Sequence, residues 1–209
     1  MNNIKNIIFD LDGTLWDSRE QIIQAWKNTL QNSLNLSISA DDLNSIMGKT
    51  NEAIKEKFFK DFDDDIAEKY LNDCQESEVK YLNKYGANIY NETLNTINKL
   101  SSKYNLFIVS NCQSGYIESF IQYYKLEDKF KDIECSGNTN KDKSYNTKII
   151  IKRNNLDTKD TCFIGDTEGD YIAAKNNNLT FIFANYGFGN CNTPDIEINS
   201  IEELLNILK

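Results

Sequence analysis

Short apolar runs alternate with amphipathic stretches along most of this chain, and this alternation restricts the possible folds more than any other feature. The apolar runs are 4–9, 106–109, 162–164 and 180–184, with a weaker one near 133–135. Uninterrupted runs of this length are typical of strands that are buried on both faces. Helical periodicity is found between and after them, at 93–100, 116–124, 147–154, 169–177 and 201–208. The alternation predicts an α/β fold in which a parallel sheet is sandwiched between helices.

The stretch 16–85 departs from this alternation, because almost all of it shows helical periodicity alone. Apolar residues such as Ile22 and Trp26 recur there one helical turn apart. We therefore expect an all-helical domain at 16–85, inserted into a core that is formed by 1–15 and 86–209. The chain contains a single proline, so short ordered hinges are expected to join the two parts.

The absence of histidine from all 209 residues limits the chemistry that is open to this chain. Without histidine it cannot form a Ser-His-Asp or Cys-His relay, use imidazole as a general base, or hold zinc on imidazole nitrogens. Any catalysis must therefore depend on carboxylates, or on Lys, Ser, Thr, Cys or Tyr side chains.

Net charge and cysteine content indicate which partners and which cellular compartment suit this chain. The 32 acidic residues against 23 basic ones give a net charge of −9, which argues against nucleic acid or an anionic membrane as a partner. The five cysteines are scattered and form no Cys-x-x-Cys pair, a pattern typical of reduced thiols. No signal peptide or membrane span is evident. We expect a cytoplasmic protein that is a monomer or a weak dimer.

Polar residues gather in four segments that follow the predicted strands. These segments are 10–14, 110–111, 141–143 and 165–170. Ligands bind outside the carboxyl ends of the strands in an open parallel sheet, so these segments are expected to converge. Carboxylates, a hydroxyl group and a lysine in one place are typical of a metal-dependent phosphoryl-transfer site, and oxygen ligands of this kind suit Mg²⁺. Asp10 can then serve as the nucleophile.

The segment Asp10-Leu11-Asp12-Gly13-Thr14 resembles the first motif of the haloacid dehalogenase (HAD) superfamily of phosphatases. Ser110, Lys143 and the pair Asp166 and Asp170 are similar to its second, third and fourth motifs, in the same order. The chain is most similar to the phosphoglycolate phosphatase and β-phosphoglucomutase-like branch, whose members carry a helical cap. The resemblance implies a Rossmann-like core with sheet order 5-4-1-2-3 and a cap that is inserted after the first strand.

The resemblance also implies catalytic roles. Asp10 would attack phosphorus and form an aspartyl-phosphate, and Asp12 would protonate the leaving group and later deprotonate water. Ser110 would donate a hydrogen bond to a phosphoryl oxygen. Lys143 would neutralise charge on the nucleophile and on the transferring group. Lys141 lies close by and is the alternative for this lysine.

The resemblance further implies ligands for the metal and for the substrate. The expected Mg²⁺ ligands are Asp10, Asp12 through its backbone carbonyl, Asp166 and Asp170. Asp170 has a second interpretation, as the cap of the helix that begins near it. The expected substrate-binding residues are Gly13, Asn111 and Lys49. The segment 186–189 resembles a loop of phosphoglycolate phosphatase-like members, and it either shapes a turn around an aromatic anchor or contacts the substrate.

These observations predict a Mg²⁺-dependent phosphatase that acts on a small phosphorylated metabolite. A sugar-phosphate mutase of the same superfamily is the first alternative, although the insert lacks the histidine that such mutases tend to carry. A non-catalytic module that accepts a phosphoryl group for signalling or binding is the second, although such modules are shorter and lack a helical insertion. The sequence does not identify the substrate, because specificity depends on the cap and its loops.

Overall fold

The computed structural model describes residues 3–34, 38–46 and 49–208. Within these ranges, six strands form one sheet in the order β5-β4-β1-β6-β7-β8, and every neighbouring pair is parallel. The strands are β1 (Asn6–Phe9), β4 (Asn105–Ser110), β5 (Phe130–Cys135), β6 (Thr161–Gly165), β7 (Thr180–Ala184) and β8 (Ile196–Ile198). Read from β7 to β5, the five predicted strands stand in the expected order 5-4-1-2-3. The α/β prediction is confirmed, and β8 is an additional strand.

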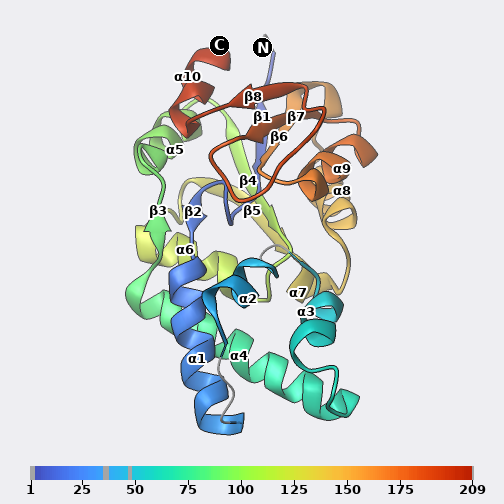
Figure 1. Ribbon diagram of the computed structural model, residues 1–209. Helices are drawn as coiled ribbons and strands as arrows, with labels where there is room; N and C mark the ends of the chain where they lie inside the picture. Colours follow the sequence, from blue (N-terminus) through green and yellow to red (C-terminus); the bar gives the residue numbers. More distant parts are fainter. Residues whose placement is uncertain (1–2, 35–37, 47–48, 209) are drawn as a thin grey trace.

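Helices cover both faces of this sheet (Figure 1). Ile7 and Phe9 of β1 pack on one face with α5 (Thr93–Ser101) and α6 (Tyr116–Tyr124), and Ile8 packs on the other with α8 (Lys143–Arg153) and α9 (Glu168–Asn176). Because successive strand residues point to opposite faces and both faces are covered, the apolar runs are continuous rather than alternating. The remaining short helices and turns of the core are α7 (Ser136–Thr139), η1 (Thr158–Asp160), η2 (Ile201–Glu203) and α10 (Leu204–Ile207).

A helical insert lies between β1 and β4. It contains α1 (Arg19–Leu34), α2 (Ala40–Asn44), α3 (Asn51–Phe58) and α4 (Asp64–Tyr85). Figure 1 shows these helices gathered at the end of the molecule away from both termini. Helix α4 packs against α1 within the insert and against α6 of the core.

The insert departs from the prediction at its first two residues, where the chain is extended. The strand β2 (Trp16–Asp17) pairs antiparallel with β3 (Asn88–Ile89), so the chain enters and leaves the insert side by side. Residues 16 and 17, which we expected to be helical, are therefore extended, because a two-residue strand is too short to show a period of two in the sequence. The division of the chain at 16–85 stays a prediction. Among the described residues, no helix is both long and apolar enough to cross a membrane.

Candidate active site

The loop that follows β1 brings Asp10 and Gly13 to the carboxyl end of the sheet. The backbone N–H of Asp10 donates to the carbonyl of Ile164 in β6 at 2.8 Å, so the chain stays beside β6 one residue beyond the strand. Gly13 has a φ of +85°, and a Cβ there would lie 2.2 Å from Oδ2 of Asp166. Glycine therefore allows the loop to take a left-handed turn in direct contact with the Asp166 carboxylate.

Lys143 lies between two buried carboxylates. Its Nζ is 2.7 Å from Oδ1 of Asp10 and 2.5 Å from Oδ1 of Asp170. Burial lowers the pKa of Lys143, but the two carboxylates outweigh burial and raise that pKa above its ordinary value. The ammonium group therefore stays charged and offsets part of the acidic charge around it.

An N-terminal cap on α8 explains how Lys143 reaches this position. The side chain of Asp142 accepts a hydrogen bond from the backbone N–H of Tyr145 at 2.8 Å, so the helix begins at Lys143 instead of at 147 as the sequence indicated. The first helical residue then directs its side chain into the buried site. Lys141, the alternative lysine, is exposed.

Three buried carboxylates form an acidic cluster at the ends of β1 and β6. Asp10, Asp166 and Asp170 each place one oxygen within 4.8 Å of the others. Oδ2 of Asp166 accepts from the backbone N–H groups of Phe188 at 2.7 Å and Gly189 at 3.3 Å. Its Oδ1 is buried and has no hydrogen-bond partner among the described residues, which is costly unless another group binds it.

The pKa values in this cluster indicate repulsion between its members. Burial and the charge of Asp170 raise the pKa of Asp166 to about 6. Burial, again with Asp170, also holds the pKa of Asp10 well above its ordinary value, although Lys143 opposes this. A divalent cation would relieve the repulsion and give the unpaired Asp166 oxygen a partner. The residues present therefore fit a metal ion held by oxygen ligands.

Asp170 belongs to the cluster and also caps α9. Its Oδ2 accepts from the backbone N–H of Thr167 at 3.0 Å, and Oγ1 of Thr167 accepts from the backbone N–H of Asp170 at 3.2 Å. This is a capping box, in which each residue satisfies a backbone donor of the other. Its Oδ1 faces Lys143 at the same time. One carboxylate thus lies where both interpretations of the sequence place it, in the acidic cluster and at the start of α9.

The carboxylate of Asp12 lies outside the acidic cluster and has its own set of donors. Its Oδ1 accepts from Nε1 of Trp16 at 2.9 Å, from Oγ of Ser18 at 2.6 Å and from the hydroxyl of Tyr116 at 2.9 Å. Burial raises the pKa of Asp12, and these three donors oppose it. The result is a fixed carboxyl group that holds its proton more strongly than a free aspartate, which suits proton transfer.

The remaining candidates lie around this centre. Ser110 is buried at the end of β4, and its Oγ accepts from the backbone N–H of Cys112 at 3.4 Å. The side-chain carbonyl of Asn111 accepts from Oγ of Ser136 at 3.2 Å. Lys49 comes from the insert, is exposed, and borders the space above Asp10 and Lys143.

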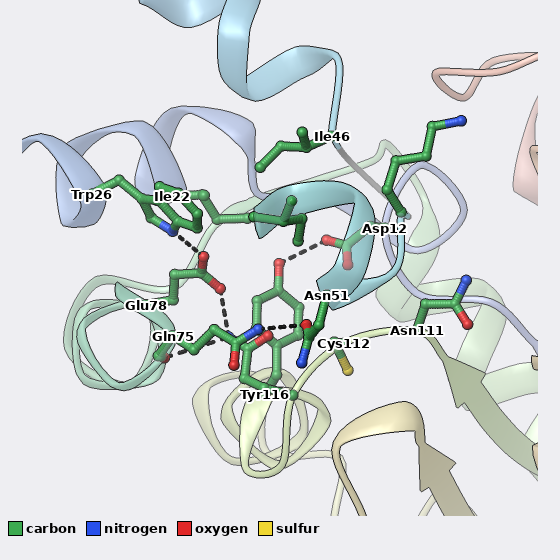
Figure 2. Close-up of a pocket in the computed structure, with 13 residues that line it drawn as sticks. Asp12, Ile22, Trp26, Ile46, Asn51, Gln75, Glu78, Asn111, Cys112 and Tyr116 are labelled. Atoms are coloured by element: carbon green, nitrogen blue, oxygen red, sulfur yellow. Dashed lines mark hydrogen bonds between the residues drawn. The ribbon is translucent and has the colours of Figure 1, made fainter. Parts of the chain in front are cut away.

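Two adjoining cavities meet at Asp12 and Lys49. The larger, of about 310 Å³, is also bordered by Asp10, Lys143 and Phe188. The smaller, of about 60 Å³, extends from Asp12 into the helical insert and is drawn in Figure 2. The site therefore has one chamber over the acidic cluster and a second beyond Asp12.

Comparison with known proteins agrees with this geometry. The sequence model described as haloacid dehalogenase-like hydrolase matches residues 7–184. The chain belongs to this family. The match begins in β1 and ends with β7, so it includes Asp10, Lys143, Asp166 and Asp170 but not the loop 186–189.

Similar proteins extend over nearly the whole of this HAD-like chain. The phosphoglycolate phosphatase of Aquifex aeolicus is 26% identical over 97% of this chain and 95% of its own length. That of Vibrio parahaemolyticus is 21% identical over 99% and 96%. A haloacid dehalogenase-like hydrolase from Streptococcus pneumoniae has the same fold, with a TM-score of 0.85, 22% identity and 100% of both chains covered.

Several residues of this HAD-like site carried no recognisable signal in the sequence. Trp16, Ser18 and Tyr116 hold Asp12, yet they come from two segments about 100 residues apart in the sequence, 16–18 and the start of α6. The sequence left two roles open for the loop 186–189, a turn around an aromatic anchor or a contact with the substrate. The structure shows a further role, because its backbone N–H groups donate hydrogen bonds to Asp166. The neighbouring Gly187 leaves room for that carboxylate, because a Cβ there would lie 2.3 Å from Cβ of Asp166. Backbone donors are independent of side-chain identity, so the sequence could not reveal them.

Proposed function

We propose that this chain is a Mg²⁺-dependent phosphatase that hydrolyses a small phosphorylated metabolite through an aspartyl-phosphate on Asp10. The arrangement of Asp10 carries the proposal: one of its oxygens is paired with Lys143, and the acidic cluster and the separately held Asp12 adjoin it. A nucleophile, a cation and a distinct proton donor thus surround one chamber.

In the first half-reaction, a carboxylate oxygen of Asp10 forms a bond to phosphorus as the bond from phosphorus to the leaving oxygen breaks. Asp12 transfers its proton to that oxygen, so an alcohol departs. Lys143 lowers the negative charge around the nucleophile. Ser110 and the backbone N–H groups near Gly13 and Asn111 would donate hydrogen bonds to the phosphoryl oxygens.

In the second half-reaction, Asp12 accepts a proton from water as the water oxygen bonds to phosphorus. The bond between phosphorus and the Asp10 oxygen breaks, which releases phosphate and restores both carboxyl groups. Asp10, Asp166 and Asp170, with the backbone carbonyl of Asp12, would hold Mg²⁺, which supplies charge neutralisation for the anionic substrate. The unpaired oxygen of Asp166 supports this ligand set.

The residues 16–85 would form the cap of this enzyme, and Lys49 would bring a cation from it to the substrate. The five cysteines are free of disulfides, which supports a cytoplasmic location. The names of the relatives make 2-phosphoglycolate the first ester to assay.

The test is phosphate release from a panel of phosphate esters with Mg²⁺, compared between wild type and Asp10→Asn. We expect turnover by the wild type, none by Asp10→Asn with an unchanged circular dichroism spectrum, and loss of wild-type turnover in EDTA. Turnover by Asp10→Asn, or turnover that persists in EDTA, would overturn the proposal. Conversion of a hexose 1-phosphate to its isomer without release of phosphate would instead support the mutase.

A further inference from the structure

The cavity beyond Asp12 contains a buried carboxyl group that the proposed mechanism does not use. Glu78 lies on α4 in the helical insert, and it is 6% exposed. Its Oε1 accepts from Nε1 of Trp26, and its Oε2 accepts from Nε2 of Gln113. Figure 2 shows Glu78 with Trp26 on one side of the group of lining residues and Asp12 on the other.

Among the described residues Glu78 has no cationic partner, and burial of a carboxylate without one costs free energy. Glutamate is almost never fully buried unless it is paired, and its two hydrogen-bond donors here are neutral. Burial raises the pKa of Glu78 to about 7, although both donors lower it. A perturbed carboxyl group that also lines a cavity is a candidate for contact with a ligand.

The position of Asp12 decides which part of a substrate meets Glu78. In an in-line displacement the leaving group departs on the side opposite the nucleophile, and in the proposed reaction it takes its proton from Asp12. The smaller cavity shares Asp12 with the larger one, but Asp10 and Lys143 border only the larger. The phosphoryl group therefore belongs over Asp10, and the organic part of the ester belongs in the smaller cavity.

The side chains that line this cavity suit an uncharged organic group that forms hydrogen bonds. Four apolar side chains line its walls: Ile22, Trp26, Ile46 and Ile54. Four side chains offer hydrogen-bonding groups: Asn51, Gln75, Glu78 and Gln113. Among the described lining residues Lys49 is the one cation, and it stands where the two cavities meet. Above about pH 7, where Glu78 is charged, it would repel a carboxylate that reached the inner end, whereas a hydroxyl group could donate a hydrogen bond to it.

We propose that Glu78 determines specificity, and that it favours esters whose leaving group carries an uncharged hydroxyl over esters whose leaving group carries a carboxylate. The inference rests on the proposed phosphatase function, since the leaving group is placed by the role of Asp12. It predicts that a polyol phosphate is a better substrate than 2-phosphoglycolate.

The experiment compares kcat/KM for sn-glycerol 3-phosphate and 2-phosphoglycolate at about pH 8, where Glu78 is charged, in three proteins: wild type, Glu78→Gln and Glu76→Gln. The amide that Glu78→Gln introduces can donate to a carboxylate, and the same substitution removes the acidic group. Glu76 lies on the same helix but is exposed and pairs with Lys80 at 3.1 Å, so its replacement controls for the loss of one negative charge. Acetyl phosphate, whose methyl end carries neither a hydroxyl group nor a carboxylate, reports the phosphatase reaction separately.

We expect wild type and Glu76→Gln to prefer glycerol 3-phosphate by about tenfold or more, the ratio that one good hydrogen bond provides. In Glu78→Gln the preference should fall by about tenfold, mainly through KM, while the variant should still turn over acetyl phosphate. If Glu78→Gln fails to fold, Trp26→Phe removes the donor that orients Glu78, and it should lower the preference in the same direction.

An equal substrate ratio in wild type and Glu78→Gln would overturn the role of Glu78, and so would a wild-type preference for 2-phosphoglycolate. A wild type that hydrolyses none of the three compounds would overturn the proposed function itself. Turnover of acetyl phosphate therefore distinguishes the two failures.

Discussion

Replacement of Lys143 by methionine is expected to destabilise the protein strongly. The substitution keeps most of the side-chain volume but removes the cation between Asp10 and Asp170, whose oxygens lie 2.7 and 2.5 Å from Nζ. The loss of one partner from a buried ion pair costs ~3–5 kcal/mol, because a buried charge is left uncompensated. Since two carboxylates lose their partner here, we expect the upper part of that range near pH 7. This is a large share of the roughly 5–15 kcal/mol that stabilises a typical domain.

The destabilisation should depend on pH and on Mg²⁺. The pKa of Asp10 is already held well above its ordinary value, and Lys143 opposes that shift, so the variant should raise it further. A folded state that binds more protons than the unfolded state loses stability as pH rises. The difference between variant and wild type should therefore be small at pH 4, grow up to neutral pH, and shrink when Mg²⁺ supplies a replacement cation.

The assay is urea denaturation followed by tryptophan fluorescence, in EDTA and then in Mg²⁺, across this pH range. Lys141→Met is the matched control, because Lys141 is exposed and only two residues away. Its free energy of unfolding should stay within about 0.5 kcal/mol of the wild-type value. The prediction is wrong if the free energy of unfolding of Lys143→Met at pH 7 in EDTA falls by less than about 1 kcal/mol, or by no more than that of the control. Either result would mean that the Lys143 ammonium group does not stabilise Asp10 and Asp170 in the folded state.

Two further predictions concern other parts of the site. The pKa of Glu78 is raised from 4.5 to about 7 in the folded state, so between these pH values the folded state binds more protons than the unfolded state. As pH rises across that interval, the free energy of unfolding of wild type should therefore fall by about 3 kcal/mol relative to that of Glu78→Gln. Urea titrations of both proteins in EDTA at pH 4.5 and 8 measure this, and a constant difference would contradict it. In Gly187→Ala the new Cβ would lie 2.3 Å from Cβ of Asp166, so the Mg²⁺ concentration for half-maximal turnover should rise at least about tenfold. Gly169→Ala, whose Cβ would come no closer than 3.4 Å to its nearest neighbour, should leave that concentration unchanged, and equal effects in both variants would argue against a positioning role for the loop.

The sheet could be predicted because its apolar runs are long enough to be recognised and the motif resemblance supplied their order. Other strands were missed: β8 has three residues with a glutamate at its centre, so it forms no apolar run, and β2 and β3 have two residues each. The start of α8 was placed too late, because the cap at Asp142 is a single side-chain hydrogen bond to the backbone of Tyr145. That cap also decides which of two neighbouring lysines contacts Asp10.

The positions of the acidic residues in the candidate site could be predicted because their motifs lie directly after strands whose carboxyl ends meet at one edge of the sheet. The groups that hold them could not be predicted in the same way. Asp166 is bound by backbone N–H groups of 188 and 189, and the donors to Asp12 come from separate segments. Glu78 is one of many charged residues on α4, and its burial follows only from the packing of that helix against α1 and α6.

The most direct test of the proposed function is to detect the proposed covalent intermediate on Asp10. The variant Asp12→Asn, which lacks the base for the second half-reaction, is incubated with acetyl phosphate and Mg²⁺, quenched in acid and reduced with borohydride, and its peptides are analysed by mass spectrometry. The account predicts that residue 10 is recovered as homoserine, the reduction product of an aspartyl-phosphate, and that Asp10→Asn shows no modified residue. An unmodified Asp10 in a variant that still consumes acetyl phosphate, or a phosphoryl group on another residue, would contradict it.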